Sequence, residues 1–291
     1  FSKFSQIFQT SGLVNQQKMA MHLRKIMVYP HSMVRWAVGG WTFFVIENGV
    51  LSENRTWLID SMGDDNYHAF YGTFSTLATL SIGYAYFRVT RKTPQIPPQL
   101  RRWKAKATPP VTAGIGSWMC MSVGLVMASQ AAPTFQIPIS FSNGPTGSSQ
   151  TNIQVRCPFD FKDNRLESND LYGTSSVRGL ERITRHPGLW SFGLIGMSQS
   201  LLAPTVPLQM WWLGPALVAW LGGSHTDSRF RRGMGGTLAP EFDCQTSNIP
   251  FLAMITGKQV GCWEGLGKET KPLNATLAIA TSSLWILRRM R

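Results

Sequence analysis

The most constraining feature of the sequence is the separation of its charges from long stretches that carry none. No charged side chain occurs in the 22 residues from Asn66 to Phe87, nor from Val111 to Ala131, nor from Pro187 to Ser224. About 20 apolar residues in a helix cross the ~30 Å hydrocarbon layer of a bilayer. Charged residues make up only 15% of the chain, against about 25% in ordinary soluble domains. We therefore expect a helical membrane protein.

The prolines of APTVPLQ divide the longest stretch, Pro187 to Ser224, into a helical hairpin. Two further apolar stretches complete the expected set of spans. The first runs from about Met33 to Leu51 and contains Arg35 and Glu47, which must lie at its ends or face protein because ionisable groups are costly in lipid. The last, Pro272 to Leu287, is either a short span or an interfacial helix. The sequence predicts an all-α, polytopic membrane protein with about five to six transmembrane helices and polar extensions.

A basic loop separates the second and third spans. It contains seven basic residues and no acidic one, namely Arg88, Arg91, Lys92, Arg101, Arg102, Lys104 and Lys106. Short basic loops stay on the inner side of a membrane, and the formal net charge of +13 implies an acidic environment for at least one face of the protein. We predict that these residues bind anionic phospholipid or an acidic partner subunit; a solvated linker is the simpler alternative. Nucleic acid is not expected, because the basic residues lie beside apolar spans.

The composition along the chain predicts three parts. Residues 1–32 form a polar, basic extramembrane arm, residues 33–260 form the transmembrane domain, and residues 261–291 form a C-terminal extension with a short apolar helix. An extramembrane insertion at residues 133–177, rich in Pro, Ser, Asn and Gly, interrupts the domain. The spacing of the four cysteines matches no metal or redox motif, so no metal site is expected.

The segment RITRHPGLW, residues 182–190, resembles the NnrU and 15-cis-ζ-carotene isomerase family. The stretch NYHAFYGTFSTLATLSIGYAYFR resembles the second conserved helix of that family, and the hairpin of residues 187–224 with TDSRFRR resembles its last two helices and basic tail. TSNIPFLAMITGKQ resembles the segment that follows. The resemblance covers roughly residues 35–92 and 178–260 and implies a helical membrane domain.

The family resemblance also implies a haem b enzyme of the plastid, in which two histidines ligate the iron. In this sequence the first position corresponds to Glu47 and the second to about Gln199, and neither is a usual haem ligand. His186 of the motif and His225 are the candidates for residual haem ligands, although His186 has the simpler role of anchoring the helix start by hydrogen bonding. Met197 is the remaining candidate donor, but methionine is also a common packing residue.

A second family shares part of the motif. Arg-His-Pro at a helix start also occurs in membrane methyltransferases of the isoprenylcysteine type, where it helps to position S-adenosylmethionine. Those enzymes carry acidic residues after the following hairpin, and we expect this chain to lack them.

The hypothesis that best fits these patterns is a non-catalytic accessory subunit of a large organellar membrane complex, derived from an NnrU-like isomerase. The replaced haem ligands, the extensions outside the resemblance and the basic charge all favour it, and it predicts no catalytic residue and no cofactor. The chain begins at Phe1 instead of Met, which favours an imported protein, and the respiratory chain of the mitochondrial inner membrane is preferred over the plastid thylakoid. The alternatives are a haem b-dependent isomerase of the plastid and a methyltransferase.

Overall fold

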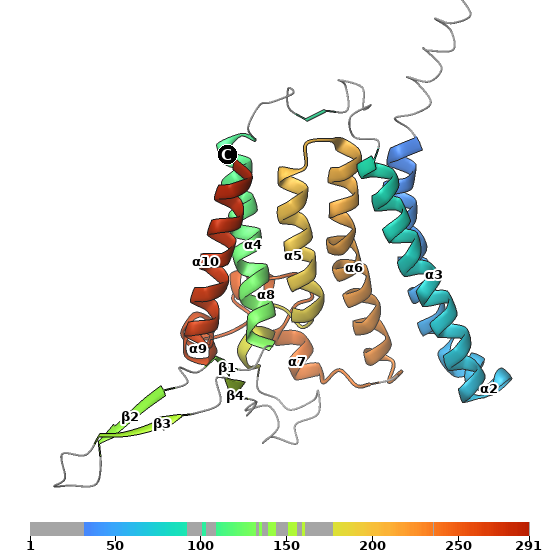
Figure 1. The fold of residues 1–291 in the computed structure, drawn as a ribbon. Helices are drawn as coiled ribbons and strands as arrows, with labels where there is room; N and C mark the ends of the chain where they lie inside the picture. The colour runs from blue at the N-terminus through green and yellow to red at the C-terminus, as the bar shows by residue number, and fades with distance from the viewer. Residues whose placement is uncertain are drawn as a thin grey trace, which may run out of the picture. The chain divides into compact units, whose positions relative to one another are not determined.

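The computed structural model of this chain describes residues 32–91, 101–102, 109–131, 134–135, 139–143, 151–155, 159–160, 177–234 and 236–290. Helices predominate in these ranges (Figure 1), as the sequence predicts. The predicted arm up to residue 31 and most of the insertion lie outside the described residues. Within the insertion, four short strands that the sequence analysis did not anticipate form two antiparallel pairs, β1 Thr134–Phe135 with β4 Phe159–Asp160 and β2 Ile139–Asn143 with β3 Thr151–Val155.

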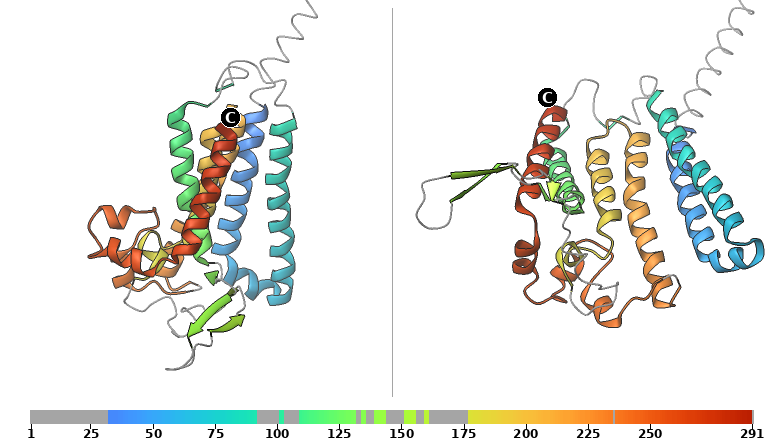
Figure 2. Two further views of the ribbon diagram at one scale, coloured as in Figure 1. Left: turned by 60° about the vertical axis from the view of Figure 1, so that its left-hand side comes forward. Right: turned by 60° about the horizontal axis from the view of Figure 1, so that its bottom comes forward.

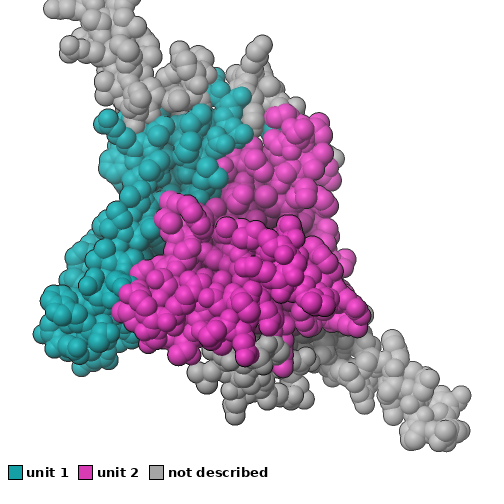
Figure 3. All heavy atoms as spheres, turned by 180° about the vertical axis from the view of Figure 1, so that it is seen from behind, with its two compact units in different colours: residues 1–109, 203–214 teal, residues 110–202, 215–291 magenta. Residues whose placement is uncertain are grey.

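The chain divides into two compact units, coloured separately in Figure 3. Unit 1 comprises residues 1–109 and 203–214, and unit 2 comprises residues 110–202 and 215–291. Helix α6, Val206–Arg231, contributes its first part to unit 1 and the rest to unit 2. This division cuts across the predicted domain of residues 33–260, because its first two spans belong to unit 1 and its third span to unit 2.

Unit 1 is built on a helical pair. A helix of residues 32–53 is followed by α2, Arg55–Met62, and by the long α3, Asp64–Arg91. A Cβ on Gly40 would lie 2.9 Å from Cβ of Ala85 and 3.0 Å from the carbonyl oxygen of Ser81, so the absence of a side chain lets the first helix approach α3 closely. At the opposite end of the pair, Leu51, Leu58 and Tyr67 form a small buried cluster.

Unit 2 is centred on α4, Val111–Ala131, which packs against both α5, Pro187–Leu202, and α10, Pro272–Met290 (Figures 1 and 2). Small residues lie at both contacts. The hydroxyl oxygens of Ser117 and Ser198 lie 2.8 Å apart, and those of Ser122 and Ser282 lie 2.6 Å apart. Close approach through small residues with hydrogen bonds between helices is typical of packing in lipid, where helices gain little from hydrophobic burial.

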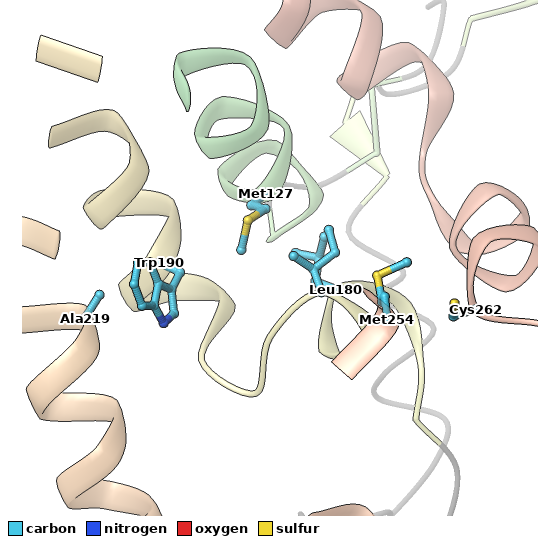
Figure 4. Packing of buried hydrophobic residues seen from close by; sticks show 7 residues of the cluster. Met127, Leu180, Trp190, Ala219, Met254 and Cys262 are labelled. Carbon is cyan, nitrogen blue, oxygen red and sulfur yellow. The ribbon is translucent and has the colours of Figure 1, made fainter. Parts of the chain in front are cut away.

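Four short elements close one end of unit 2. They are the 3₁₀ helix η3, Gly179–Arg182, and the helices α7, Pro240–Gln245, α8, Leu252–Ile255, and α9, Cys262–Glu269. A buried cluster joins this end to the long helices (Figure 4), and its members are Met127, Leu180, Ile183, Trp190, Ala219, Met254 and Cys262. The loops around the Arg-His-Pro motif are therefore held by a packed core.

The predicted spans all appear as helices. The described part of the first helix covers residues 32–53, the second predicted span lies within α3, and the third coincides with α4. Helices α5 and α6 form the predicted hairpin, in which Gly193 lies against Ala219. Helix α10 extends the last span as far as Met290. By length and apolar composition, however, α4 is the one helix among the described residues that passes as a membrane span, over Val111–Gln130. Passage of the other helices through a membrane stays a prediction.

Candidate functional site

The Arg-His-Pro motif lies where the chain enters α5. Pro187 is the first residue of that helix, a position that suits proline because the N–H it lacks would have no partner within the helix. The backbone N–H of Arg185 donates to the carbonyl of Ser247 at 3.0 Å, and the N–H of Phe251 donates to the carbonyl of Ile183 at 2.8 Å. The motif is thus bound by its backbone to residues 247–251, which come some 60 positions later in the chain.

The guanidinium group of Arg185 is buried and lies between two carboxylates. Its Nη1 atom is 2.6 Å from Oδ1 of Asp243 and 3.2 Å from Oδ2 of Asp227, and its Nη2 donates to the carbonyl of Thr246 at 3.3 Å. Asp227 is itself only 4% exposed. Its other oxygen is 2.8 Å from Nε2 of His186. Two consecutive motif residues therefore share one buried carboxylate.

Asp243 extends this cluster to the surface of the unit. Arg231 donates to both of its oxygens, from Nε at 2.7 Å and from Nη2 at 2.8 Å. The hydrogen bonding from Arg231 lowers the pKa of Asp243, and the positive charge of Arg185 acts in the same direction. We refer to Arg185, His186, Asp227, Arg231 and Asp243 as the ion cluster. Its two arginines and two aspartates balance in charge.

Asn248 makes a second, neutral connection between the same segments. Its Oδ1 accepts from the indole N–H of Trp190 at 2.9 Å, and its Nδ2 donates to the carbonyl of Trp220 at 2.9 Å and to the hydroxyl of Ser224 at 3.0 Å. A Cβ on Gly223 would lie 2.4 Å from Oδ1 of Asn248. Only glycine fits there, so the amide joins α5, α6 and the loop after α7 at close range.

A third connection holds η3 against α9. Arg182 donates to Glu269 from Nη2 at 2.7 Å and from Nε at 3.0 Å, and the backbone N–H of Gly179 donates to the same carboxylate. The hydrogen bonds from Arg182 lower the pKa of Glu269. Parallel hydrogen bonds between arginine and a carboxylate fix geometry as well as charge. The ion cluster, Asn248 and this pair together bind residues 179–190 to the second half of unit 2.

This arrangement is suited to holding the chain in place. The polar ends of the ion cluster are directed at one another, and the one buried atom of the cluster without a hydrogen bond is Nε of Arg185. Among the described residues, no group of three or more His, Cys, Asp or Glu side chains could hold a metal ion.

The two residues that the sequence resemblance compares with haem ligands do not fit haem b. Glu47 is buried on the first helix of unit 1, where its Oε2 accepts from Nδ2 of Asn48 at 2.6 Å, and Gln199 is buried on α5. Haem iron takes imidazole, thiolate, thioether or phenolate donors, and these two side chains offer carboxylate and amide oxygens. His186 engages Asp227 through Nε2, and Met197 packs against the buried cluster of unit 2. The remaining candidate, His225, is half-buried on α6.

The predicted basic loop is described in part. Arg88 and Arg91 lie in the last turn of α3, and Arg102 donates from Nη1 to the carbonyl of Ala203 at 3.2 Å and from its backbone N–H to the carbonyl of Pro204 at 2.9 Å. Arg101 forms a backbone bridge to Thr205. The other three residues, Lys92, Lys104 and Lys106, lie outside the described residues.

Sequence reasoning missed the acidic side of the site. It took the chain to lack acidic residues after the hairpin, but Asp227 stands directly after it and binds both Arg185 and His186. The available signal was topological, because a hairpin returns the chain to the end at which it began. Asp243 and Asn248 had no comparable signal.

Comparisons with protein-family models, with curated proteins and with solved structures found no match for this chain.

Proposed function

We propose that this chain is a non-catalytic, membrane-embedded accessory subunit of a large organellar complex, derived from an NnrU-like isomerase. The preferred location is the mitochondrial inner membrane, with a respiratory-chain assembly as the complex. Such a subunit acts by packing: its helices contact lipid and the helices of neighbouring subunits, and its basic side chains contact anionic headgroups or acidic neighbours.

The observation that carries the proposal is the set of large apolar side chains that the described helices leave uncovered. On α3, Leu77, Leu80, Tyr84 and Phe87 are between 46% and 62% exposed. Their spacing of three, four and three residues places them on one face of the helix. Contiguous apolar faces of this kind are rare on monomeric soluble proteins and mark contact with another protein or with a membrane.

Helix α10 supports the same conclusion in unit 2. Leu273, Leu277, Leu284 and Leu287 are between 43% and 71% exposed, while the opposite side of the helix packs on α4 through Ser282. Arginines in its last turn end the apolar face, as is common where a helix reaches a headgroup layer.

The ion cluster supports a structural role over a catalytic one. Proton-transfer catalysis needs a group directed toward a substrate, whereas Asp227 and His186 are directed at each other and at Arg185. For the alternative of a haem b isomerase, the donors at the two expected positions do not fit. A methyltransferase was disfavoured because acidic residues were expected to be lacking after the hairpin, but Asp227 stands there. Binding of S-adenosylmethionine is therefore one of the properties to test.

The experiment that tests the proposal is native electrophoresis of membranes solubilised in mild detergent, with the chain detected by an epitope tag. We expect the tagged chain to resist alkaline extraction from the membrane and to migrate with a respiratory assembly. Migration as a free monomer would contradict the proposal.

Spectroscopy of the purified chain separates the enzyme alternatives. We expect no stoichiometric Soret band and no tight binding of S-adenosylmethionine. A Soret band that disappears in His186→Ala or His225→Ala would establish the haem enzyme instead, and saturable cofactor binding would establish the methyltransferase.

A further inference from the structure

A groove opens on unit 1 between the first helix and α3. Its volume is about 540 Å³, within the range of about 300–1,000 Å³ typical of small-molecule sites. The residues that line it include Arg35, Trp36, Gly39, Phe43 and Tyr84. The side chains of Trp36, Phe43 and Tyr84 are each about two-fifths exposed or more, so the groove presents aromatic surface to whatever occupies it.

The polar groups of the groove are concentrated at one end. Ser32 and Arg35 lie at the start of the described part of the first helix, and none of the described residues that line the groove is acidic. Farther along, the hydroxyl of Ser81 donates to the carbonyls of Ala78 and Gly40 at 2.7 Å and 3.3 Å, so it is already satisfied. The groove thus has a cationic end and an apolar body.

A second cation lies beside the same end. The guanidinium carbon of Arg88 is 5.7 Å from the ring centre of Trp36 and 5.9 Å from that of Tyr84. The two rings meet edge to face with their centres 5.1 Å apart. Arg88 therefore contacts the aromatic pair that lines the groove together with Arg35, an arrangement that suits an anionic group at the mouth of the groove.

The length of the groove matches one leaflet of a bilayer. Ser32 and Phe43 are eleven residues apart on one helix, which corresponds to about 16 Å at ~1.5 Å per residue. Half of the hydrocarbon thickness of about 30 Å is about 15 Å. Arg35 and Phe43 are eight residues apart on this helix, or about 12 Å, so a ligand with its charged head at Arg35 and an apolar tail reaching Phe43 extends through most of one leaflet, as a membrane lipid does.

We propose that this groove is a binding site for one anionic phospholipid, with the phosphate at Arg35 and Arg88 and an acyl chain along Gly39 and Phe43. This inference rests on the proposed membrane location, and it goes beyond it by assigning a specific site. From the sequence, lipid contact was expected only at the basic loop, and Arg35 was expected to lie at a helix end or to face protein. In the groove, Arg35 supplies the selectivity for an anion.

Two neighbouring glycines allow a sharp test. A Cβ on Gly39 would meet nothing within 4 Å, whereas a Cβ on Gly40 would come within 3.0 Å of α3. Gly39→Leu therefore places a side chain in the groove from a position where its Cβ meets no neighbour. Gly49→Leu is the matched control, because Gly49 lies on the same helix, outside the groove, and its Cβ would also meet open space.

The charge is tested with a second pair of variants. Arg35→Gln removes the cation at the end of the groove, and Arg55→Gln removes one on α2, away from the groove. One cation beside an anionic lipid is worth about 1 kcal/mol, or about fivefold in affinity. Because Arg35 is exposed, its replacement leaves folding intact even if Gly39→Leu proves unstable.

The measurement is native mass spectrometry of the full chain in detergent, titrated with phosphatidylglycerol or phosphatidylcholine. We expect one phosphatidylglycerol per chain, bound several-fold more tightly than phosphatidylcholine. Gly39→Leu should abolish this binding, Arg35→Gln should weaken it about fivefold, and both controls should bind as the native chain does. Circular dichroism of each variant checks that the helices are retained.

The proposal is overturned if neither lipid binds, if both bind equally, or if folded Gly39→Leu binds like the native chain. Failure here is distinguishable from failure of the proposed function. A chain that migrates with a respiratory assembly but binds no phosphatidylglycerol refutes the lipid site alone. A chain that binds the lipid but migrates freely refutes the accessory role alone.

Discussion

Asp227 is the residue on which the structural interpretation of the Arg-His-Pro motif depends. It is 4% exposed and accepts contacts from Arg185 at 3.2 Å and His186 at 2.8 Å. The substitution Asp227→Asn keeps the size of the side chain, removes its charge and turns one acceptor into a donor. We expect this change to destabilise the chain while leaving the helices in place.

The magnitude follows from what the substitution leaves behind. Breaking a buried charge pair costs about 3–5 kcal/mol when the remaining charge has no other partner. Arg185 keeps Asp243 at 2.6 Å and the carbonyl of Thr246 at 3.3 Å, so the loss should approach that of a single hydrogen bond to a charged group. We expect about 2–3 kcal/mol, or a fall in Tm of roughly 3–5 °C for a chain of this size.

The assay is thermal unfolding of the purified chain in mild detergent, followed by tryptophan fluorescence. Glu264→Gln is the matched control, because it also converts a carboxylate to an amide but in an exposed pair with Lys268, where the loss should stay within about 0.5 kcal/mol. If buried charge is the cause, the double variant Arg185→Met with Asp227→Leu should be more stable than Asp227→Leu alone. Equal midpoints for Asp227→Asn and Glu264→Gln would refute the reasoning.

Three further predictions address other parts of unit 2. Asp243 and Glu269 have pKa values that are lowered in the folded chain. Their contribution to stability is therefore complete above the unfolded pKa values of 3.8 and 4.5 and is lost as the pH falls through the lower folded values. Tm should decrease on acidification below about pH 4.5, and a Tm independent of pH in that range would count against these ion pairs. Gly124→Leu should lower the free energy of unfolding by about 1–3 kcal/mol, because its Cβ would lie 3.0 Å from a backbone carbonyl oxygen of α5. Gly83→Leu is the control and should change Tm little, because a Cβ there meets open space. Equal effects of the two variants would contradict the packing argument. Ser117→Ala removes a buried hydrogen bond between helices and should cost about 0.6 kcal/mol, measurable by unfolding in denaturing detergent; a loss above 2 kcal/mol would show that this contact has been underestimated.

The helices could be predicted from the sequence because the information needed is local. A run without charges is a property of neighbouring residues, and α4 begins and ends where the sequence places its span. Hydropathy is a separate property from the absence of charge. The segment from Asn66 to Phe87 has no charge but is rich in Tyr, Ser, Thr and Gly. Helix α3 therefore forms, but it is less apolar than α4, which alone among the described helices is long and apolar enough to cross a membrane.

The ion cluster could be predicted only on one side. Arg185 and His186 stand in a recognisable motif, whereas their partners are side chains 41 and 58 positions away that only the folded hairpin and α7 bring near. A carboxylate that follows a hairpin is an informative signal, since antiparallel helices return the chain to its starting end. Glu47 and Gln199 could be compared with haem ligands from the sequence, but their burial is visible only in the structure.

The length of α5 gives a physical reason for the cluster that requires no catalysis. Its 16 residues span about 24 Å, less than the ~30 Å of a bilayer's hydrocarbon layer. In the proposed membrane location, Arg185 at the start of this helix lies near the lipid boundary, and an unpaired charge that enters the hydrocarbon layer costs several kcal/mol. Asp227 and Asp243 both pair with Arg185 there. Acidic partners from the returning chain therefore stabilise the start of this short helix, and this role requires no catalysis.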